Sequence, residues 1–433
     1  MSTIPQVSRI MQECLIEVAE RLGREVGFVQ RVRKLTGAKF VQILVCAFQS
    51  NPQASYSDLR QTGASLGVEV SQQGLEQRFT PEAVRLLEGV LAHTTQQVIA
   101  SQPVAVELLR RFRGVYLQDS STISLPASLV SVWPGAGGSQ GASAALKLHV
   151  RWEFNTGMLQ GPCVQDGRKH DQNSPLQEVE LAPGSLRLAD LGYFNLKKMA
   201  QENAHGVYWI TRFKHGTKLW DENGQALDLL AWLQSQTATQ IDCQVKLGQH
   251  EQIPCRLIAI RVSQRVVDQR RRQLREYARK KQVPLKQERL KLAAWTLFLT
   301  NVPQATLSWT DVTIMARLRW QIELIFKLWK TSGRLDEWRS QKPERILCEL
   351  YAKLIGLIMF HWIALTALWG YPERSLVNAI KIMQTYAVLI AIALAGNTLT
   401  SALMLVKKCM VATCRMGKRR THPNAYQLLC YDA

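Results

Sequence analysis

Residues 113–119 read Arg-Gly-Val-Tyr-Leu-Gln-Asp, an apolar run that closes on an acid and is followed by Ser120-Ser121-Thr122. This pattern predicts a buried strand that ends at Asp119, before a turn. Residues 186–190, Leu-Arg-Leu-Ala-Asp, repeat the pattern and predict a second strand that ends at Asp190. Because α/β sheets place reactive groups at the carboxyl ends of strands, both acids are candidates for chemistry.

The segments around these two runs alternate between strand and helix patterns. Strands are predicted within 146–152, 161–164, 207–210, 244–247, 256–260 and 295–300, and helices at 174–179 and 196–202. Residues 214–294 break the rhythm and predict a partly β insertion. Strands followed by helices indicate a mixed α/β sheet covered by helices.

Both ends of the chain are expected to be helical. Residues 1–105 carry apolar side chains at helical spacing, and Thr80 before Pro81 has the form of a helix start. A DNA-reading module and an ordinary helical bundle are both open for this segment. Residues 354–369 and 386–395 are nearly all apolar but shorter than the about 18 to 20 residues of a membrane-spanning helix. We expect buried helices there, with membrane attachment as the alternative.

The composition indicates a folded protein with a polyanionic partner. The 433 residues are 46% hydrophobic, which excludes a disordered chain. The 54 Lys and Arg residues against 34 Asp and Glu give a net charge of +20, which points to nucleic acid or else to an anionic membrane surface. The N-terminal residues lack a basic region followed by an apolar stretch, so we expect no signal peptide and a cytoplasmic protein.

Three parts of the chain hold cations that could contact phosphates. Residues 265–291 contain few acids, so a phosphate-contacting face is expected there, with a solvated helix face as the alternative. Lys147 is a further candidate, for which a plain surface lysine is equally open. The candidates in 265–291 are Arg270, Arg271, Arg272, Lys280 and Lys281. A C-terminal basic cluster comprises Lys407, Lys408, Arg415, Lys418, Arg419 and Arg420.

A helical segment at 319–330 supplies a third acid, Glu323. Helical spacing places Arg319, Glu323, Lys327 and Lys330 on one face and predicts that the opposite, apolar face packs inward. Alone, this pattern describes an ordinary amphipathic helix. Together with Asp119 and Asp190, Glu323 would complete a set of three carboxylates. Mg²⁺ prefers such oxygen ligands, and two ions about 4 Å apart can activate an attacking hydroxyl and stabilise a leaving oxygen in phosphodiester chemistry.

In order and spacing, these blocks resemble those of bacterial insertion-sequence DDE transposases. The similarity is to the cut-and-paste group, which has an Asp-x-Gly-Tyr block, here Asp190-Leu191-Gly192-Tyr193. Its third block, YREK, has a tyrosine, an arginine three residues later, a glutamate four after that and a lysine seven further on. Arg319, Glu323 and Lys330 fit this spacing, whereas Ala316 stands at the tyrosine position.

The resemblance covers residues 110 to 365 and implies a ribonuclease-H-like catalytic domain. Asp119, Asp190 and Glu323 would bind two Mg²⁺ ions, with Mn²⁺ able to replace them. The enzyme would cleave the ends of its element and join the freed 3′-hydroxyls to target DNA. Phosphates near the cleaved end would be held by Arg319, Lys327 and Lys330. Because some relatives stack a flipped base on tryptophan, Trp320 and Trp295 are candidates for that contact.

The resemblance also implies the partners and the domains. The partners would be double-stranded DNA, as terminal inverted repeats and as target, and a second copy of the chain, at the bacterial nucleoid. A catalytically inactive, transposase-derived DNA-binding protein is the alternative, which Ala316 supports, and a membrane-associated protein is a third. The expected parts are a DNA-end-binding domain at 1–105, a catalytic domain at 106–213 and 295–345, a basic insertion at 214–294, and a helical C-terminal region with a basic tail at 346–433.

Overall fold

A computed structural model describes residues 2–31, 34–137, 142–371, 373–416 and 425–431. The chain divides into two compact units. The first unit takes residues 1–106, 119–178 and 320–432, and the second takes 107–118 and 179–319. The boundary passes through a strand, because residues 118 and 119 belong to different units.

The second unit is built on a mixed sheet. Its strands follow the order β1, β4, β5, β9, β8, β7, β6, and only the first four residues of β1 belong to it. β1, β4 and β5 run parallel, whereas each neighbouring pair from β5 to β6 is antiparallel. The strands are β1 (Val115–Leu125), β4 (Leu186–Ala189), β5 (Tyr208–Arg212), β6 (Leu219–Trp220), β7 (Gln240–Leu247), β8 (Ile253–Arg261) and β9 (Trp295–Thr300).

Helices bury one face of these strands in an apolar core. Met199 of α8 and Leu233 of α9 pack into a cluster with Trp209, Leu257 and Leu299 of the sheet. The helices of this unit are α7 (Glu107–Arg110), α8 (Leu196–Ala204), α9 (Leu229–Ser235), α10 (Gln264–Lys281), α11 (Gln287–Leu292) and α12 (Trp309–Leu318). The strands predicted within 207–300 and the helix predicted at 196–202 are confirmed.

β1 continues into the first unit, where β2 (Ala144–Glu153) and β3 (Leu159–Asp166) lie beside it in the order β3, β2, β1. The prediction that the strand ends at Asp119 is therefore wrong. Ile123 and Leu125 are buried while Thr122 and Ser124 are exposed, so residues 122–125 alternate as a strand does. Residues 120–122 all carry hydroxyl side chains, a composition that suits a turn as well as a half-exposed strand.

The helix predicted at 174–179 is also wrong. Only Pro175–Gln177 form a single 3₁₀ turn. Residues 178–180 are all exposed, so the segment lacks the second turn of buried side chains that would stabilise a longer helix. The buried Arg151 of β2 donates a hydrogen bond to the carbonyl of Leu176 and holds the single turn in place.

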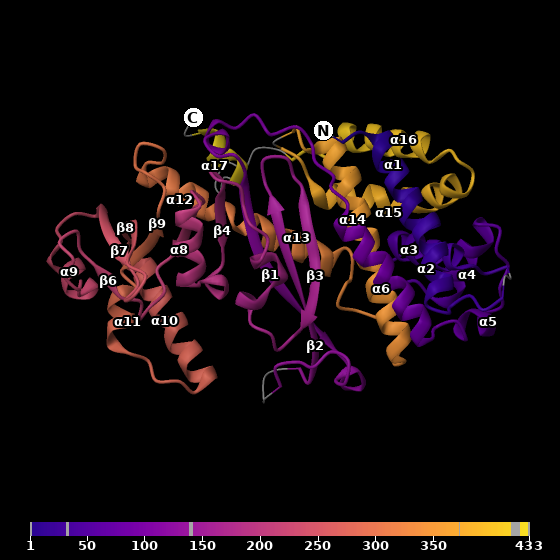
Figure 1. Cartoon of the computed structure of the whole chain (residues 1–433), viewed down its shortest axis with the longest axis horizontal. Coiled ribbons are helices and arrows are strands. Elements are labelled where there is room, and N and C mark those ends of the chain that lie inside the picture. Colours follow the sequence, from indigo (N-terminus) through magenta and orange to yellow (C-terminus); the bar gives the residue numbers. More distant parts are fainter. Residues whose placement is uncertain (1, 32–33, 138–141, 372, 417–424, 432–433) are drawn as a thin grey trace. The chain divides into compact units, whose positions relative to one another are not determined.

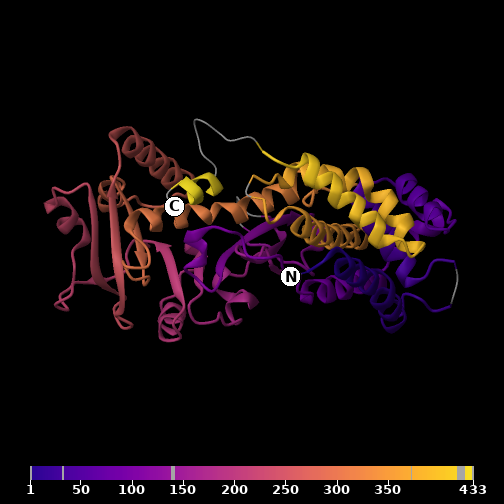
Figure 2. The same cartoon turned by 90° about the horizontal axis from the view of Figure 1, so that it is seen from above.

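The helices of the first unit surround one long core helix, α14 (Pro343–Leu368). N-terminal helices α3 and α6 and the C-terminal helix α16 pack against it, so the two ends of the chain share one core (Figures 1 and 2). The other helices are α1 (Ile4–Gln12), which continues through a π-helical segment Glu13–Val18 into α2 (Ala19–Glu25), then α3 (Gly37–Ser50), α4 (Tyr56–Ser65), α5 (Gln72–Glu76), α6 (Pro81–Gln96), α13 (Trp320–Thr331), α15 (Leu376–Ala395), α16 (Leu399–Thr413) and α17 (Ala425–Tyr431). The mixed α/β class with helical terminal regions is confirmed.

Two described helices, α14 and α15, are long and apolar enough to cross a membrane by length and composition. The apolar stretch of α14 is entirely buried within the unit, which confirms a core helix there. Only 39% of the corresponding stretch of α15 is buried, so the prediction of a buried helix holds for one face of α15. Val388, Leu389 and Ile392 are exposed on its other face.

His361 lies in the middle of α14 and is fully enclosed. Its Nε2 lies 2.8 Å from the carbonyl of Gly157 at the end of the β2–β3 hairpin, and its ring meets that of Trp152 edge-on. Burial lowers the pKa of His361 to about 4, with Arg374 acting in the same direction. The neutral imidazole donates through Nε2–H, so the hydrogen bond exists without a buried charge.

We expect the stability of the first unit to fall as the pH falls from about 6.5 toward 4. In this range the unfolded chain binds a proton on His361 that the folded chain does not, so acid favours unfolding. His361→Gln should reduce the pH dependence by on the order of 1–3 kcal/mol, as measured by urea unfolding across that range. His170→Gln, at an exposed position, is the control and should leave the curve unchanged. An unaltered curve for His361→Gln would contradict the expectation.

Candidate active site and nucleic-acid surface

Asp119 is half-buried on β1 within the first unit, beside a small polar cluster. Its Oδ1 accepts a hydrogen bond of 2.8 Å from the backbone N–H of Ser120, whose hydroxyl donates to Asp171 Oδ1, also at 2.8 Å. Lys147 Nζ donates to the same Asp171 oxygen at 3.0 Å and to the carbonyl of Lys169 at 2.6 Å. The Lys147 side chain is only 12% exposed, so any DNA contact would have to compete with this ion pair.

Asp190 lies in the second unit, immediately after β4, and its side chain is exposed. The predicted strand end at this acid is confirmed. Gln118 of β1 pairs with Ala189 of β4, and Asp119 and Asp190 are the next residues in the chain after these two partners. An Arg319 guanidinium nitrogen lies 3.9 Å from Asp190 Oδ1, which places a cation beside this carboxylate.

Helix α13 presents Glu323 as predicted. Ile322, Ile325, Phe326 and Trp329 are buried, which confirms the inward face, while Lys327 is exposed. Lys330 Nζ donates to the carbonyl of Thr122, 3.0 Å away, so the helix is attached to β1 three residues beyond Asp119.

The two candidate tryptophans differ in exposure. Trp320, next to Arg319, is 54% exposed and stands one turn before Leu324, which is 52% exposed. Trp295 is 7% exposed and packs in the core of the second unit, with the Arg261 guanidinium 5.4 Å from its ring centre. Of the two, only Trp320 offers an accessible ring for stacking a base.

The three acids supply the kind of donor that a hard divalent cation requires, since each contributes only carboxylate oxygen. Among the residues that the structure describes, no three His, Cys, Asp or Glu side chains are grouped so as to hold a metal ion. Asp119 and Glu323 belong to the first unit and Asp190 to the second. The donor chemistry therefore fits Mg²⁺, and the shared metal site remains a prediction.

Helix α10 has two different faces. Arg270 donates to the carbonyls of Ala293 and Trp295 and to the hydroxyl of Thr296, and Arg271 donates to the carbonyl of Leu290. Burial lowers the pKa of Arg270, with Arg212 nearby. These two arginines therefore attach α10 to its own unit. The sequence run Arg270-Arg271-Arg272 does not show this, because neighbouring cations in a helix point in different directions. The exposed cations of the helix are Arg265, Arg272, Arg275, Arg279, Lys280 and Lys281.

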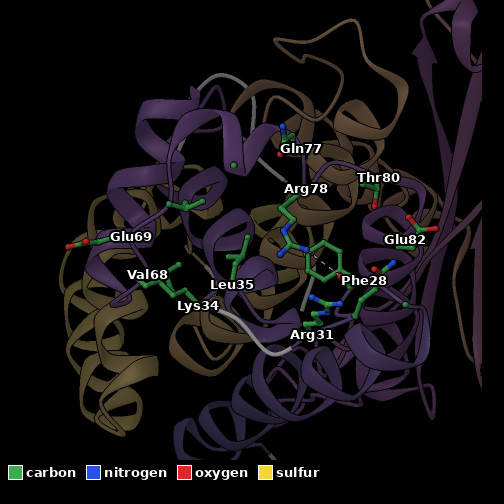
Figure 3. Close-up of a pocket in the computed structure, with 14 residues that line it drawn as sticks. Phe28, Arg31, Lys34, Leu35, Val68, Glu69, Gln77, Arg78, Thr80 and Glu82 are labelled. Atoms are coloured by element: carbon green, nitrogen blue, oxygen red, sulfur yellow. Dashed lines mark hydrogen bonds between the residues drawn. The ribbon is translucent and has the colours of Figure 1, made fainter.

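A cavity of about 710 Å³ opens in the N-terminal helical region (Figure 3). Arg78 stacks on the ring of Phe28 at 5.5 Å, and Arg31, Lys34 and Gln77 line the same space. The groove is not predictable from a local pattern, because Phe28, Arg31 and Lys34 lie more than 40 positions before Gln77 and Arg78 in the chain. In the C-terminal cluster, Arg415 pairs with Glu373 at 3.6 Å, whereas Lys418, Arg419 and Arg420 lie outside the described residues.

Comparison with known proteins decides the family. A family model described as "Transposase DDE domain" matches residues 110–359, more than half of the chain. The chain is a DDE transposase of the bacterial insertion-sequence type. The matched residues include Asp119, Asp190, Glu323 and helix α10.

The transposase is similar along most of its length to curated relatives. It is 28% identical to the transposase for insertion sequence element IS231F of Bacillus thuringiensis subsp. israelensis, over 82% of this chain and 79% of the relative. It is 25% identical to that for IS231B of Bacillus thuringiensis subsp. berliner, over 90% and 86% of the two chains. With the transposase for IS1151 of Clostridium perfringens the identity is 24%, over 81% and 79%. The similarity therefore extends on both sides of the matched domain.

Proposed function

We propose that this transposase cleaves the ends of its insertion sequence and joins the 3′-hydroxyl ends to target DNA, with Asp119, Asp190 and Glu323 as its metal-binding acids. The observation that supports this most directly is the pairing of Gln118 with Ala189 in two neighbouring parallel strands. Asp119 directly follows Gln118 and Asp190 directly follows Ala189, so the two acids come at matching positions. Helix α13 brings Glu323 into the unit of Asp119 and is attached to the same strand. When bound, two Mg²⁺ ions would supply the polarisation of the attacking hydroxyl and of the leaving oxygen.

The other residues of the site would bind and orient DNA. Arg319, within 3.9 Å of Asp190, offsets carboxylate charge at the position where phosphate oxygens would approach. Lys327 is exposed on α13 and would contact a second phosphate. Lys330 would have to share its ammonium between a phosphate and the carbonyl of Thr122. Trp320 presents an open ring next to Arg319, which suits a base drawn out of the duplex.

The alternative function, a transposase-derived protein that binds DNA without cutting it, rests on Ala316. A methyl group at this half-buried position of α12 supplies neither the hydroxyl nor the ring of a tyrosine. Incubation of the purified protein with Mg²⁺ and a duplex carrying the element's inverted repeat decides between the two functions. Cleavage at the repeat supports the enzyme, and tight binding without cleavage supports the alternative.

The remaining proposals concern partners, domains and location. Residues 1–105 would bind the inverted repeats, the catalytic domain would comprise 106–213 and 295–345, the basic insertion would span 214–294, and 346–433 would form the C-terminal region. Two copies of the chain would act on paired ends of the element. The protein would work in the cytoplasm on nucleoid DNA, with Mg²⁺ as the metal and Mn²⁺ as a replacement.

Charge on the outer face of α10 should set the salt dependence of DNA binding. Replacing Arg272, Lys280 and Lys281 by Gln removes three exposed cations, so the slope of log affinity against log salt should fall by about 2 to 3. Fluorescence anisotropy with a duplex of unrelated sequence measures it. Replacing Arg168, Lys342 and Lys381, which are exposed cations outside the proposed DNA-binding set, is the matched control. Equal slopes for the two triple variants would refute the assignment.

The N-terminal groove should read sequence. Gln77 offers an amide to a base edge, while Lys34 and Arg78 offer charge to phosphates. We expect Gln77→Ala to weaken binding to the inverted repeat about tenfold while binding to unrelated DNA changes little. Lys34→Gln should weaken both by similar factors. If Gln77→Ala lowered both affinities equally, the groove would bind only the backbone.

A further inference from the structure

The helix that carries Glu323 ends in a turn held by three other parts of the first unit. Residues 332–337 follow α13, and Arg334 adopts a left-handed conformation with φ of 42°. Gly333 N–H donates to the carbonyl of Leu328 at 3.2 Å, and a side chain at Gly333 would lie 2.7 Å from the carbonyl of Trp329. The geometry of this turn is therefore narrowly constrained.

Lys353 of α14 is the centre of that attachment. Its ammonium donates to the carbonyls of Arg334 at 2.9 Å and Glu337 at 2.7 Å, and it pairs with Glu349 at 2.8 Å. These contacts use all three donors of a side chain that is 2% exposed. Lysine is rarely buried in this way unless its charge is fully compensated. Two of the three compensating groups are backbone carbonyls of the turn.

The same turn is connected to the N-terminal helical region and to α15. Gln53, between α3 and α4, donates to Glu337 Oε2 at 2.6 Å, and Arg334 Nη1 reaches the same oxygen at 2.7 Å. Gln384 of α15 donates to the carbonyl of Ser332 at 3.1 Å. The end of α13 is thus fixed by elements that precede and follow it in the chain.

We propose that Lys353 is a positioning residue for Glu323, and that the turn 332–337 joins the N-terminal helical region to the helix on which Glu323 stands. A helix moves as a rigid rod over short distances, so a shift of the turn would move Glu323, which lies eight residues, or about 12 Å, before Thr331 at the end of α13. At the same C-terminal end, just before the turn, the helix is also attached to β1 through Lys330 and Thr122. This role rests on the proposed function of Glu323.

The main test variant is Lys353→Met combined with Glu349→Gln, which removes the Lys353 clamp, that is, its contacts with Arg334, Glu337 and Glu349, without leaving a buried carboxylate that has lost its lysine. The buried guanidinium of Arg345, 3.8 Å from Glu349, keeps a neutral acceptor beside it in this variant. Gln53→Leu is a milder variant that cuts only the link to the N-terminal region, and Lys353→Arg tests rescue by another donor. Lys342→Met is the matched control, because Lys342 pairs with Glu76 at 2.8 Å and also joins the N-terminal region to the start of α14, but not to the turn.

The first measurement is amide hydrogen exchange of α13 without metal or DNA. The double variant should exchange at least about tenfold faster over residues 328–335, Gln53→Leu should be intermediate, and Lys342→Met should match the parent protein. The second measurement is the Mg²⁺ concentration for half-maximal cleavage, which should rise by about tenfold in the double variant and be restored by Lys353→Arg. A purely structural role would lower the yield of active protein at an unchanged Mg²⁺ requirement.

Parent-like exchange in α13 for both the double variant and Gln53→Leu would overturn the inference, as would an unchanged Mg²⁺ requirement in the double variant. Failure of the proposed function of Glu323 would be recognised by a different result. If Glu323→Gln still cleaves DNA, the acid assignment fails, whereas the exchange measurement still reports on the clamp.

Discussion

Asp119→Asn, Asp190→Asn and Glu323→Gln should each reduce Mg²⁺-dependent end cleavage by about a thousandfold or more, while the affinity for DNA stays within about threefold of the parent. Each change keeps the size of the side chain and removes one negative charge, so the fold is conserved and a metal ligand is lost. Cleavage is measured by gel electrophoresis of an end-labelled duplex, and affinity by anisotropy in the absence of metal. Binding should become slightly tighter, because a carboxylate no longer repels phosphate.

Glu178→Gln is the matched control for these acids. It makes the same change of charge at an exposed position of the first unit, and cleavage should be unaffected. If one of the three acid variants cut at the parent rate, that residue would be removed from the proposed metal site. If all three did, the catalytic proposal would be wrong, although the family assignment would stand.

Arg187→Met should destabilise the second unit by about 3–5 kcal/mol. Arg187 of β4 forms a close pair with Glu202 of α8, with nitrogen–oxygen distances of 2.7 to 2.9 Å, and the two side chains are only 5% and 7% exposed. Loss of the guanidinium leaves the Glu202 carboxylate buried without its partner. Urea unfolding, followed by amide hydrogen exchange in the strands of the second unit, measures the change.

A double replacement distinguishes the loss of the ion-pair attraction from the cost of leaving the Glu202 carboxylate buried without a partner. Arg187→Met with Glu202→Met should recover most of the stability, since two apolar side chains replace a buried ion pair. The exposed pair Arg21 and Glu25 gives the contrast, because both side chains are more than half exposed and Arg21→Met should cost at most about 1 kcal/mol. A double variant as unstable as Arg187→Met alone would show that packing, and not the unpaired carboxylate, dominates.

The sequence predicted local features well where short-range periodicity determines them. The inward face of α13 follows from helical spacing, and β4, which ends before Asp190, follows from the short run Leu186-Arg187-Leu188-Ala189. The end of β1 was misjudged because Ser120 to Thr122 suit a turn and a half-exposed strand equally well. A run of cations does not show which of its members face their own unit, and the DNA contacts of Arg270 and Arg271 stay a prediction.

Long-range contacts were not predictable. Nothing near Gln53 or Lys353 in the sequence indicates the turn after α13, since these residues are separated from it by 284 and 16 to 19 positions. The sequence does not predict the pairing of Lys147 with Asp171 either. A strand lysine that faces solvent and one in a buried ion pair have the same local sequence pattern. The three acids are predicted from the spacing of three blocks that resemble a known family, because no single block predicts them alone.

The course of β1 has a consequence for how the molecule unfolds. Its first four residues pair with β4 in the second unit, and the rest of the strand belongs to the first. The four pairs that β1 makes with β4 therefore lie within the second unit, and the strand leaves that unit at the peptide bond between residues 118 and 119. We expect a cut at this bond to loosen the pairing of β1 with β4, so that amide hydrogens of residues 186–189 exchange faster than in the intact chain.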